Sequence, residues 1–267
     1  MKPIVKETRV DKLFDFTDKV TLITGAGGVG EAFARGYAKQ GARVVLLDVF
    51  EKSCLNLIAK LNDEGLEADF FIADVTDKAA VDAVVREIAD KYGRIDILLH
   101  TAGVTRNKRC TEFTADDIEF VLDINLNGTI YMNQAVANVM KEQGGGKIVD
   151  IGSIGGLMSH MDCSMPYEAS KAAVHQIVKT FANELSPYNI NVNSIAPYFI
   201  RTPMVEHQSQ EYKDASYALA SLGRWLEPEE LLGAAYLLTS DAGNAITGQI
   251  LAVDGGYSAI KSMYVMR

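Results

Sequence analysis

Short apolar runs alternate with amphipathic stretches along almost the whole of this 267-residue chain. The apolar runs lack strict polar alternation, which is typical of strands that are buried on both faces of a sheet. We predict seven strands, at residues 20–24, 43–47, 69–72, 95–99, 147–151, 190–195 and 249–253. Helices are expected at residues 30–40, 53–62, 78–92, 114–140 (one long or broken helix), 166–185 and 228–239.

This order of elements predicts an α/β protein with a doubly wound Rossmann fold, a seven-stranded parallel sheet with helices on both faces. No Pro-rich linker or repeat interrupts the pattern, so we expect one domain over residues 1–267, with its core at about residues 14–258. Residues 203–224 are the least regular stretch. They are interpreted either as a lid over a substrate site or as a plain surface excursion.

An excess of acidic side chains limits the partners of this protein. The chain has 35 acidic and 26 basic residues, which argues against nucleic acid and anionic membranes because both need a basic surface. The N-terminal segment lacks the apolar core of a signal peptide and no stretch is long enough to span a membrane, so a cytoplasmic protein is expected. No residue group has metal-ligand spacing, so no metal is expected. The cysteines are interpreted as buried free thiols: Cys54, Cys110 and Cys163.

A glycine-rich turn follows the first predicted strand. The run Gly25-Ala26-Gly27-Gly28-Val29-Gly30 has G-x-G-x-x-G spacing and opens a predicted helix. Glycines let the backbone approach a pyrophosphate there, and the start of the helix supplies free N–H groups. Asp48 ends the second strand, where a carboxylate can accept both hydroxyls of an adenosine ribose; a solvated aspartate is the alternative. Its charge would repel the 2′-phosphate of NADP, and Lys52 is the only close basic residue that could offset this repulsion. NAD is therefore favoured over NADP.

Tyr167 and Lys171 are four residues apart at the start of a predicted helix, and therefore lie on one face of it. A phenol has a pKa of about 10, and an adjacent ammonium can supply much of the stabilisation needed for it to act as a base near pH 7. Ser153 follows the fifth strand, at the sheet edge where ligands bind. A tyrosine and a lysine at this spacing are usually a solvated pair, but together with the glycine turn, Asp48 and Ser153 they favour an active site.

These motifs resemble the short-chain dehydrogenase/reductase family over about residues 14–258. The resemblance implies that Tyr167 is the acid/base, that Lys171 lowers its pKa and holds the nicotinamide ribose, and that Ser153 polarises the substrate oxygen. Asn125 would order a relay water. The resemblance also implies further cofactor contacts, from Asp74, Val75, Thr101, Ala102, Gly103, Pro197, Ile200 and Thr202.

Three features depart from the family pattern. The glycine turn is one residue shorter than usual, which leaves open which backbone N–H meets which phosphate oxygen. Thr101 replaces the usual asparagine, so we expect some hydrogen bonds that brace the strands to be lost. Tyr198 stands where the family has a glycine, and its ring would narrow the nicotinamide end or form a wall of the substrate site.

The expected function is NAD-dependent oxidation of a secondary alcohol to a ketone. Residues 12–20 resemble the sugar-acid and polyol branch, such as gluconate 5-dehydrogenases. Hydroxysteroid or bile-acid oxidation, 3-oxoacyl thioester reduction and a non-catalytic dinucleotide-binding role are the alternatives. The segment before Tyr167 would border the substrate, where methionines suit an apolar molecule and the polar residues suit hydroxyls: Met158, His160, Met161, Asp162, Cys163 and Met165.

Two histidines and the long helices bear on the surroundings of the site. His100 is interpreted as a core or strand-end group, and His175 as a surface or interface residue. Helices at 114–140 and 166–185 are long and apolar enough to pair with another subunit. The family resemblance implies a homotetramer; the alternative is that these helices cover only their own sheet.

Overall fold

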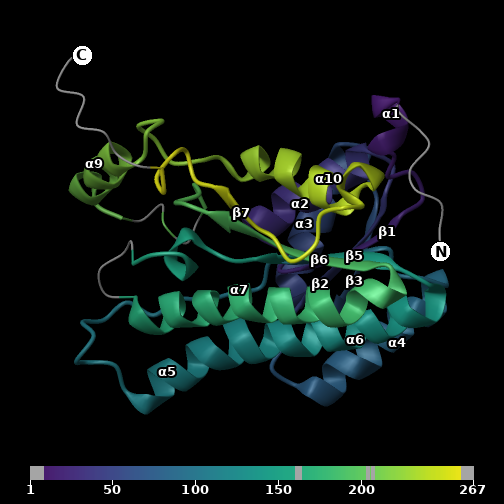
Figure 1. The fold of residues 1–267 in the computed structure, drawn as a ribbon, viewed down its shortest axis with the longest axis horizontal. Coiled ribbons are helices and arrows are strands. Elements are labelled where there is room, and N and C mark those ends of the chain that lie inside the picture. Colours follow the sequence, from purple (N-terminus) through teal and green to yellow (C-terminus); the bar gives the residue numbers. More distant parts are fainter. Residues whose placement is uncertain (1–8, 160–163, 203–204, 206–207, 260–267) are drawn as a thin grey trace.

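A seven-stranded parallel sheet forms the centre of the protein, in a computed structural model that describes residues 9–159, 164–202, 205 and 208–259 (Figure 1). The strand order is β3-β2-β1-β4-β5-β6-β7, so the chain reverses its direction of progress across the sheet between β1 and β4. This confirms the predicted fold. The strands are β1 (Val20–Thr24), β2 (Arg43–Asp48), β3 (Ala68–Ile72), β4 (Ile97–His100), β5 (Gly146–Ile151), β6 (Ile190–Pro197) and β7 (Ile250–Val253).

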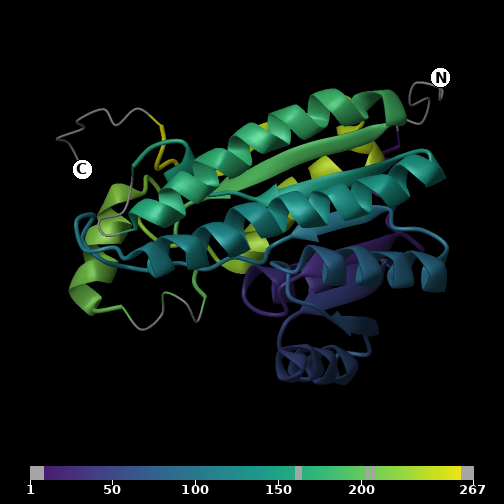
Figure 2. The same ribbon diagram turned by 90° about the horizontal axis from the view of Figure 1, so that it is seen from below.

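Helices cover both faces of the sheet. On one face lie α2 (Val29–Lys39), α3 (Glu51–Asp63) and α10 (Leu232–Thr239). On the other lie α4 (Lys78–Tyr92), α6 (Gly128–Gln143) and α7 (Met165–Leu185), the last two running along the sheet in Figure 2. Shorter elements complete the fold: α1 (Val10–Leu13), α5 (Ala115–Leu122), η1 (Asp123–Asn127), η2 (Ile154–Gly156), η3 (Ser186–Tyr188), α9 (Gln210–Leu219), η4 (Pro228–Leu231) and η5 (Asp241–Gly243).

Local sequence signals explain where several elements begin and end. The Asp77 side chain accepts the N–H groups of Ala79 and Ala80 at the start of α4, and Gly93 ends that helix with a φ of 76°. Thr114 and Asp117 form a capping box at the start of α5. Strand β4 begins at Ile97 rather than at Ile95, because the N–H of Ile95 bonds the side chain of Gln143.

The predicted helix at 114–140 is broken rather than continuous. Helix α5 passes through a π-helical turn, η1, into α6. Such turns are rare within α-helices and often occur at functional sites. The insertion places Asn125 at the centre of the break, fully buried, with its backbone carbonyl accepting the Thr129 hydroxyl at 2.6 Å.

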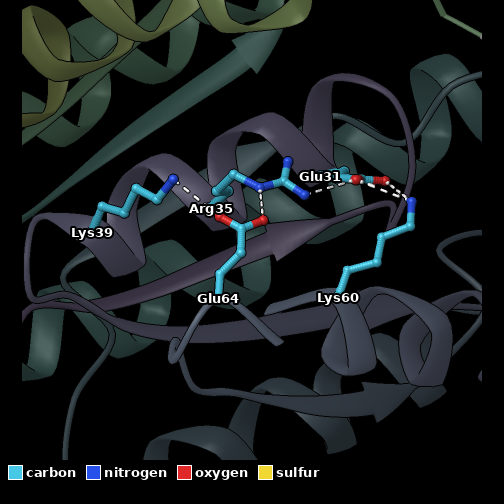
Figure 3. A network of polar contacts seen from close by, with 5 residues as sticks. All are labelled: Glu31, Arg35, Lys39, Lys60 and Glu64. Atoms are coloured by element: carbon cyan, nitrogen blue, oxygen red, sulfur yellow. Dashed lines mark hydrogen bonds and ion pairs between the residues drawn. The ribbon is translucent and has the colours of Figure 1, made fainter. Parts of the chain in front are cut away.

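Charged residues join α2 to α3 on the outer side of the sheet, as Figure 3 shows. Glu31 accepts hydrogen bonds from Arg35 and Lys60, and Glu64 pairs with Arg35 and Lys39. Burial alone would raise the pKa of Glu31, but the hydrogen bonds from Lys60 and Arg35 hold it below its usual range. The network therefore pairs Arg35 and Lys39 of α2 and Lys60 of α3 with glutamates.

The stretch at 203–224 is more regular than expected, because it contains helix α9, which Ser209 caps through a hydrogen bond to the N–H of Tyr212. The surrounding residues form a separate apolar cluster with the fully buried Trp225, whose indole N–H bonds the hydroxyl of Ser216 at 2.7 Å. Its aromatic rings make stacked and edge-on contacts: Phe199 stacks on Trp225 with 5.5 Å between ring centroids, and Tyr217 meets Trp225 edge-on at 5.4 Å. A role as a lid stays a prediction.

Two predictions about single side chains were wrong. His175 is only 4% exposed, because it lies one turn beyond Lys171 on the face of α7 that packs on the sheet. Cys110 is exposed in the loop that precedes α5, whereas Cys54 is buried as expected. Cys163 lies outside the described residues. Within the described ranges, no helix is long and apolar enough to span a membrane, and no cluster could hold a metal ion.

Candidate functional site

A cavity of about 710 Å³ runs along the carboxyl edge of the sheet, between the glycine turn and the start of α7. This edge is where parallel α/β sheets bind ligands, beside the point at which the strand order reverses. Most of the predicted site residues line it. Two do not: Gly30 packs beneath the turn, and Asn125 lies behind the cavity wall.

The glycine turn packs tightly on its own backbone at Gly30 and is open toward the cavity at Gly27. Gly25 has a φ of 85° and Gly28 a φ of 53°, values that favour glycine. A Cβ on Gly30 would lie 1.8 Å from the carbonyl oxygen of Gly25, so only glycine lets α2 approach the strand there. A Cβ on Gly27 would meet nothing within 4 Å, because that residue faces the cavity. The turn thus presents the start of α2, at Val29, to the cavity.

Asp48 fixes the turn to the end of β2. One carboxylate oxygen accepts the N–H of Ala26 at 2.8 Å, and the other accepts the N–H of Phe50 at 2.8 Å. The shorter turn left open which backbone N–H groups could meet a phosphate. The N–H of Ala26 is not one of the free groups, because it is directed at Asp48. Each carboxylate oxygen has a second lone pair for a ligand hydroxyl. Asp74 and Val75 line the same end of the cavity.

Thr101 preserves the bracing that its replacement of asparagine was expected to lose. Its hydroxyl donates to the carbonyl oxygen of Thr24 at 2.5 Å, and its N–H donates to the Thr24 hydroxyl at 3.0 Å. The N–H of Ala102 also donates to the Thr24 hydroxyl, at 3.2 Å. A threonine hydroxyl can thus reach the backbone of the neighbouring strand at this position.

Ser153, Tyr167 and Lys171 meet at the other end of the cavity. The N–H of Gly155 donates to the Ser153 hydroxyl at 3.0 Å, at the start of η2. The Lys171 Nζ lies 5.7 Å from the centroid of the Tyr167 ring and donates to the carbonyl oxygen of Ile151 at 2.7 Å. The predicted pairing on one face of the helix is therefore present.

Burial governs the acidity of this cluster. It raises the pKa of Tyr167 above its usual value, although a hydrogen bond with Ser153 opposes the rise. Burial also lowers the pKa of Lys171 to about 8, while the charge of Asp150 acts in the other direction. The net direction for the phenol is opposite to the expected one, because desolvation outweighs the hydrogen bond with Ser153 and the charge of Glu168 adds to the rise.

Asn125 lies behind the cavity wall, where its side chain bonds residues close to Lys171. Its Oδ1 accepts the N–H of Val104 at 2.8 Å, and its Nδ2 donates to the Ser170 hydroxyl at 3.0 Å. A Cβ on Gly103 would lie 3.4 Å from Asn125 Oδ1 and 3.5 Å from Lys171 Nζ, so both atoms approach the same small space. The π-helical turn thus places the amide beside the lysine.

An aromatic wall closes the end of the cavity beyond Tyr167. Tyr198 donates its hydroxyl hydrogen to the carbonyl oxygen of Ser216 at 3.1 Å and stacks on Tyr257, with 4.3 Å between ring centroids. It therefore forms a fixed wall, one of the two outcomes expected of it. Ile200, Thr202 and Pro197 also line this end.

Sequence motifs did not reveal every residue of the cavity. The additional lining residues come from loops, from α5 and from α9, and they include Phe50, Asn107, Phe120, Phe199, Gln208 and Tyr212. Phe50 carried a usable signal, since it is a large apolar residue two positions after the strand-end Asp48. It is 67% exposed in the structure. Four of the residues expected to border the substrate lie outside the described residues: His160, Met161, Asp162 and Cys163.

A dinucleotide-type glycine turn and a buried tyrosine–lysine pair at one sheet edge define an oxidoreductase of the doubly wound class. Comparison with known proteins agrees. The family described as "Enoyl-(Acyl carrier protein) reductase" matches residues 25–258. The 3-oxoacyl-[acyl-carrier-protein] reductase of Thermotoga maritima is 36% identical over 239 residues, 89% of this chain and 97% of that protein. The D-threitol dehydrogenase of Mycolicibacterium smegmatis is 38% identical over 256 residues, 95% of this chain and 98% of that protein.

Solved structures show the same relationship. A gluconate 5-dehydrogenase from Burkholderia cenocepacia, in complex with NADP and tartrate, has a TM-score of 0.90 and 33% identity, covering 95% of this chain and 100% of that one. The chain therefore belongs to the short-chain dehydrogenase/reductase family, whose members bind a nicotinamide dinucleotide. This confirms the resemblance found in the sequence. The substrates named for these relatives differ.

Proposed function

We propose that this protein is an NAD-dependent dehydrogenase that oxidises a secondary alcohol to a ketone. The observation that carries the proposal is one continuous cavity with Asp48 at one end and Ser153, Tyr167 and Lys171 at the other. A cofactor held along it would have its adenosine at Asp48 and its nicotinamide beside Tyr167. When bound, the cofactor supplies the hydride acceptor.

The residues at the adenosine end fit NAD. The turn leaves open space above Gly27, and Asp48 retains lone pairs for ribose hydroxyls. A 2′-phosphate at this position would meet a carboxylate at close range. The described residues that line this end include no basic side chain, and Lys52 of α3 is not among them. Arg35 and Lys60 are ion-paired with glutamates. The relative with NADP bound makes this choice worth measuring directly.

The catalytic end supplies the proton chemistry. We assign Tyr167 as the base that accepts the alcohol proton, with the Ser153 hydroxyl donating a hydrogen bond to the same substrate oxygen. A protonated Lys171 would stabilise the Tyr167 phenolate and bond the nicotinamide ribose. Asn125 would order a water that connects Lys171 to solvent. Burial makes the ammonium more important, because the phenol is otherwise held in its neutral form.

For the substrate we favour an uncharged polyol within the expected sugar-acid and polyol class. Among the described lining residues, Lys171 is the one cation, and its Nζ already bonds the Ile151 carbonyl. Asn107 and Gln208 offer neutral hydrogen-bonding groups beside the aromatic wall. Binding would remove a substrate carboxylate from water, and among the described lining residues no cation besides Lys171 could pair with it. Burying an unpaired charge costs free energy. A hydroxysteroid, a 3-oxoacyl thioester and a purely binding role remain the alternatives.

A matched pair of substrates tests this proposal. D-glucitol and D-gluconate differ at one end, where a hydroxymethyl group replaces the carboxylate, so their comparison isolates the charge. We expect reduction of NAD with D-glucitol, or with a shorter polyol, to exceed that with D-gluconate in kcat/KM, and NAD to exceed NADP. Faster turnover of D-gluconate would contradict the substrate choice. Absence of turnover across polyols, hydroxysteroids and 3-oxoacyl thioesters would favour the binding role.

Three further predictions concern the whole protein. We propose a single domain over residues 1–267, a homotetramer and a cytoplasmic location. Size-exclusion chromatography with light scattering measures the assembly, and a monomer would leave α5, α6 and α7 covering only their own sheet. Fractionation of cells that express the protein tests the location.

A further inference from the structure

Four polar side chains form a row across the middle of the sheet. Thr24 of β1, His100 of β4, Asp150 of β5 and Ser194 of β6 occupy successive register positions, each directly beside the next. Each is 2% exposed or less. Most rows of a buried parallel sheet are apolar, so four adjacent polar side chains here require a reason.

The row faces the helices that carry the active site. Side chains two residues apart on a strand point to the same face, and the residues two before each member pack with α4, α6 and α7: Leu22, Leu98, Ile148 and Val192. The row therefore faces α6 and α7 at the carboxyl ends of β1 and β4, and one residue before the end of β5. Asp150 accepts a hydrogen bond there from Asn133 of α6 at 2.7 Å.

Hydrogen bonding assigns the protons of the row. The Thr24 hydroxyl oxygen accepts the N–H groups of Thr101 and Ala102, so its hydrogen is directed at His100 Nδ1, 2.9 Å away. His100 then carries its own proton on Nε2. Within the described part of the chain, that Nε2 and Asp150 Oδ1 have no hydrogen-bond partner. A donor and a carboxylate oxygen are thus buried side by side on adjacent strands.

Lys171 is the charged neighbour of this carboxylate. Its Nζ donates to the carbonyl oxygen of Ile151, the residue after Asp150. The other polar side chains named here, on β4, β6, α6 and α7, are uncharged near neutral pH. Burial lowers the pKa of His100 to about 3 and that of His175 on α7 to about 4, while Asn133 and Ser194 do not titrate. Asp150 and Lys171 therefore depend on each other for charge compensation.

We propose that Asp150 is a positioning residue, a buried carboxylate beneath the active site that keeps Lys171 protonated and so sets the pH range in which Tyr167 accepts a proton. The inference rests on the proposed function, because it assigns Tyr167 as the base. Burial raises the pKa of Asp150 to about 7, opposed by Asn133 and Lys171, and lowers that of Lys171 to about 8. Both groups thus change charge close to the pH at which the enzyme would work.

The experiment is the pH dependence of kcat/KM for alcohol oxidation in Asp150→Asn, which keeps the shape of the side chain and removes its charge. Without the carboxylate, Lys171 loses its proton more readily and the Tyr167 pKa rises. We expect the acidic limb of the profile to move up by about one pH unit, a loss of about tenfold at pH 7. Asn133→Leu removes the hydrogen bond to Asp150 and should move the limb the same way by a smaller amount.

Thr21→Val is the matched control. Thr21 is a fully buried polar residue of the same sheet, but it points to the opposite face and lies away from Lys171. We expect it to leave the profile in place. An unchanged acidic limb in an Asp150→Asn protein that still binds NAD would overturn the proposal, as would equal rate losses in all three variants without any shift. If Asp150→Asn does not fold, Asn133→Leu decides by the same criterion.

A second measurement separates this inference from the proposed function. Tyrosinate absorbance is titrated in the NAD-bound protein, and the signal of Tyr167 is isolated by difference from Tyr167→Phe. The Tyr167 titration should move to higher pH in Asp150→Asn whether or not an alcohol has been found that the protein oxidises. An unmoved titration with active wild-type enzyme overturns only the role of Asp150. Failure of all turnover with a moved titration overturns only the proposed function.

Discussion

The two halves of the cavity differ in the groups that line and support them. In the nucleotide half, formed by β1, β2, α2 and α3, the cavity is lined by the glycine backbone and by Asp48, whose oxygens accept two backbone N–H groups. In the catalytic half, formed by β4, β5, β6, α6 and α7, buried titratable side chains dominate, with Lys171 and Asp150 both shifted from their usual pKa values. The shape of the backbone dominates the nucleotide half, whereas burial sets the proton affinity of the side chains in the catalytic half.

This difference predicts how each half fails. Substitutions in the nucleotide half should weaken cofactor binding or stability with little change in proton affinity. Substitutions in the catalytic half should remove turnover or alter its pH dependence while the fold and cofactor binding persist. The variants below test that division.

The largest effect is expected in the catalytic half. Tyr167→Phe removes the hydroxyl assigned as the base, and we expect kcat to fall by about a thousandfold with NAD affinity nearly unchanged. Stopped-flow or steady-state absorbance of reduced cofactor measures the rate, and fluorescence titration measures binding. Tyr188→Phe is the control, since Tyr188 is 46% exposed and outside the cavity. A rate near wild type in Tyr167→Phe would refute the assignment.

Steric loss in the nucleotide half comes next. Gly30→Ala would place a Cβ 1.8 Å from the Gly25 carbonyl oxygen, and we expect a loss of about 3 kcal/mol in the free energy of unfolding. Gly233→Ala is the matched control, because nothing lies within 4 Å of its added Cβ. That variant should gain about 0.5 kcal/mol through helix propensity. Denaturant unfolding compares the two; equal stability would contradict the close packing of the turn.

Cofactor choice should respond to Asp48. In Asp48→Ala the turn loses its hydrogen bond from Ala26 and the repulsion of a 2′-phosphate disappears. We expect KM for NAD to rise about tenfold and the preference for NAD over NADP to shrink. Asp48→Asn separates the two causes, since it keeps a hydrogen-bond acceptor and removes the charge. Tighter NAD binding in either variant would argue against a ribose contact.

The smallest effect is expected in the ion-pair network of Figure 3. The pKa of Glu31 is held below its ordinary value of 4.5, so its contribution to stability is present above that pH and is lost as the pH falls further. Glu31→Gln should cost about 0.5 kcal/mol at pH 7 and less under acid or high salt. Thermal unfolding of the wild type and of Glu31→Gln, at pH 7 and at an acidic pH below 4.5, measures this difference. A penalty that grows in acid would have the wrong sign.

The nucleotide half was largely predictable from the sequence. Gly25, Gly28 and Gly30 are required by local geometry, through positive φ angles or a close approach of two backbones, and such requirements leave a mark at fixed spacing. The doubly wound fold class followed because right-handed crossovers leave few alternatives. Helix α9 was missed, because the aromatic cluster beneath it consists of residues far apart in the chain.

Sequence alone determined the fold class and the family and singled out Ser153, Tyr167 and Lys171, because strand periodicity, glycine spacing and helix spacing are local properties of the chain. Tertiary structure decided which groups are buried. It placed His175 inside the protein, turned Thr101 into a brace, and brought Asp150 close enough to Lys171 for their charges to interact. Proton affinity depends on the solvent and charges that surround a group, and those neighbours are brought together only by folding.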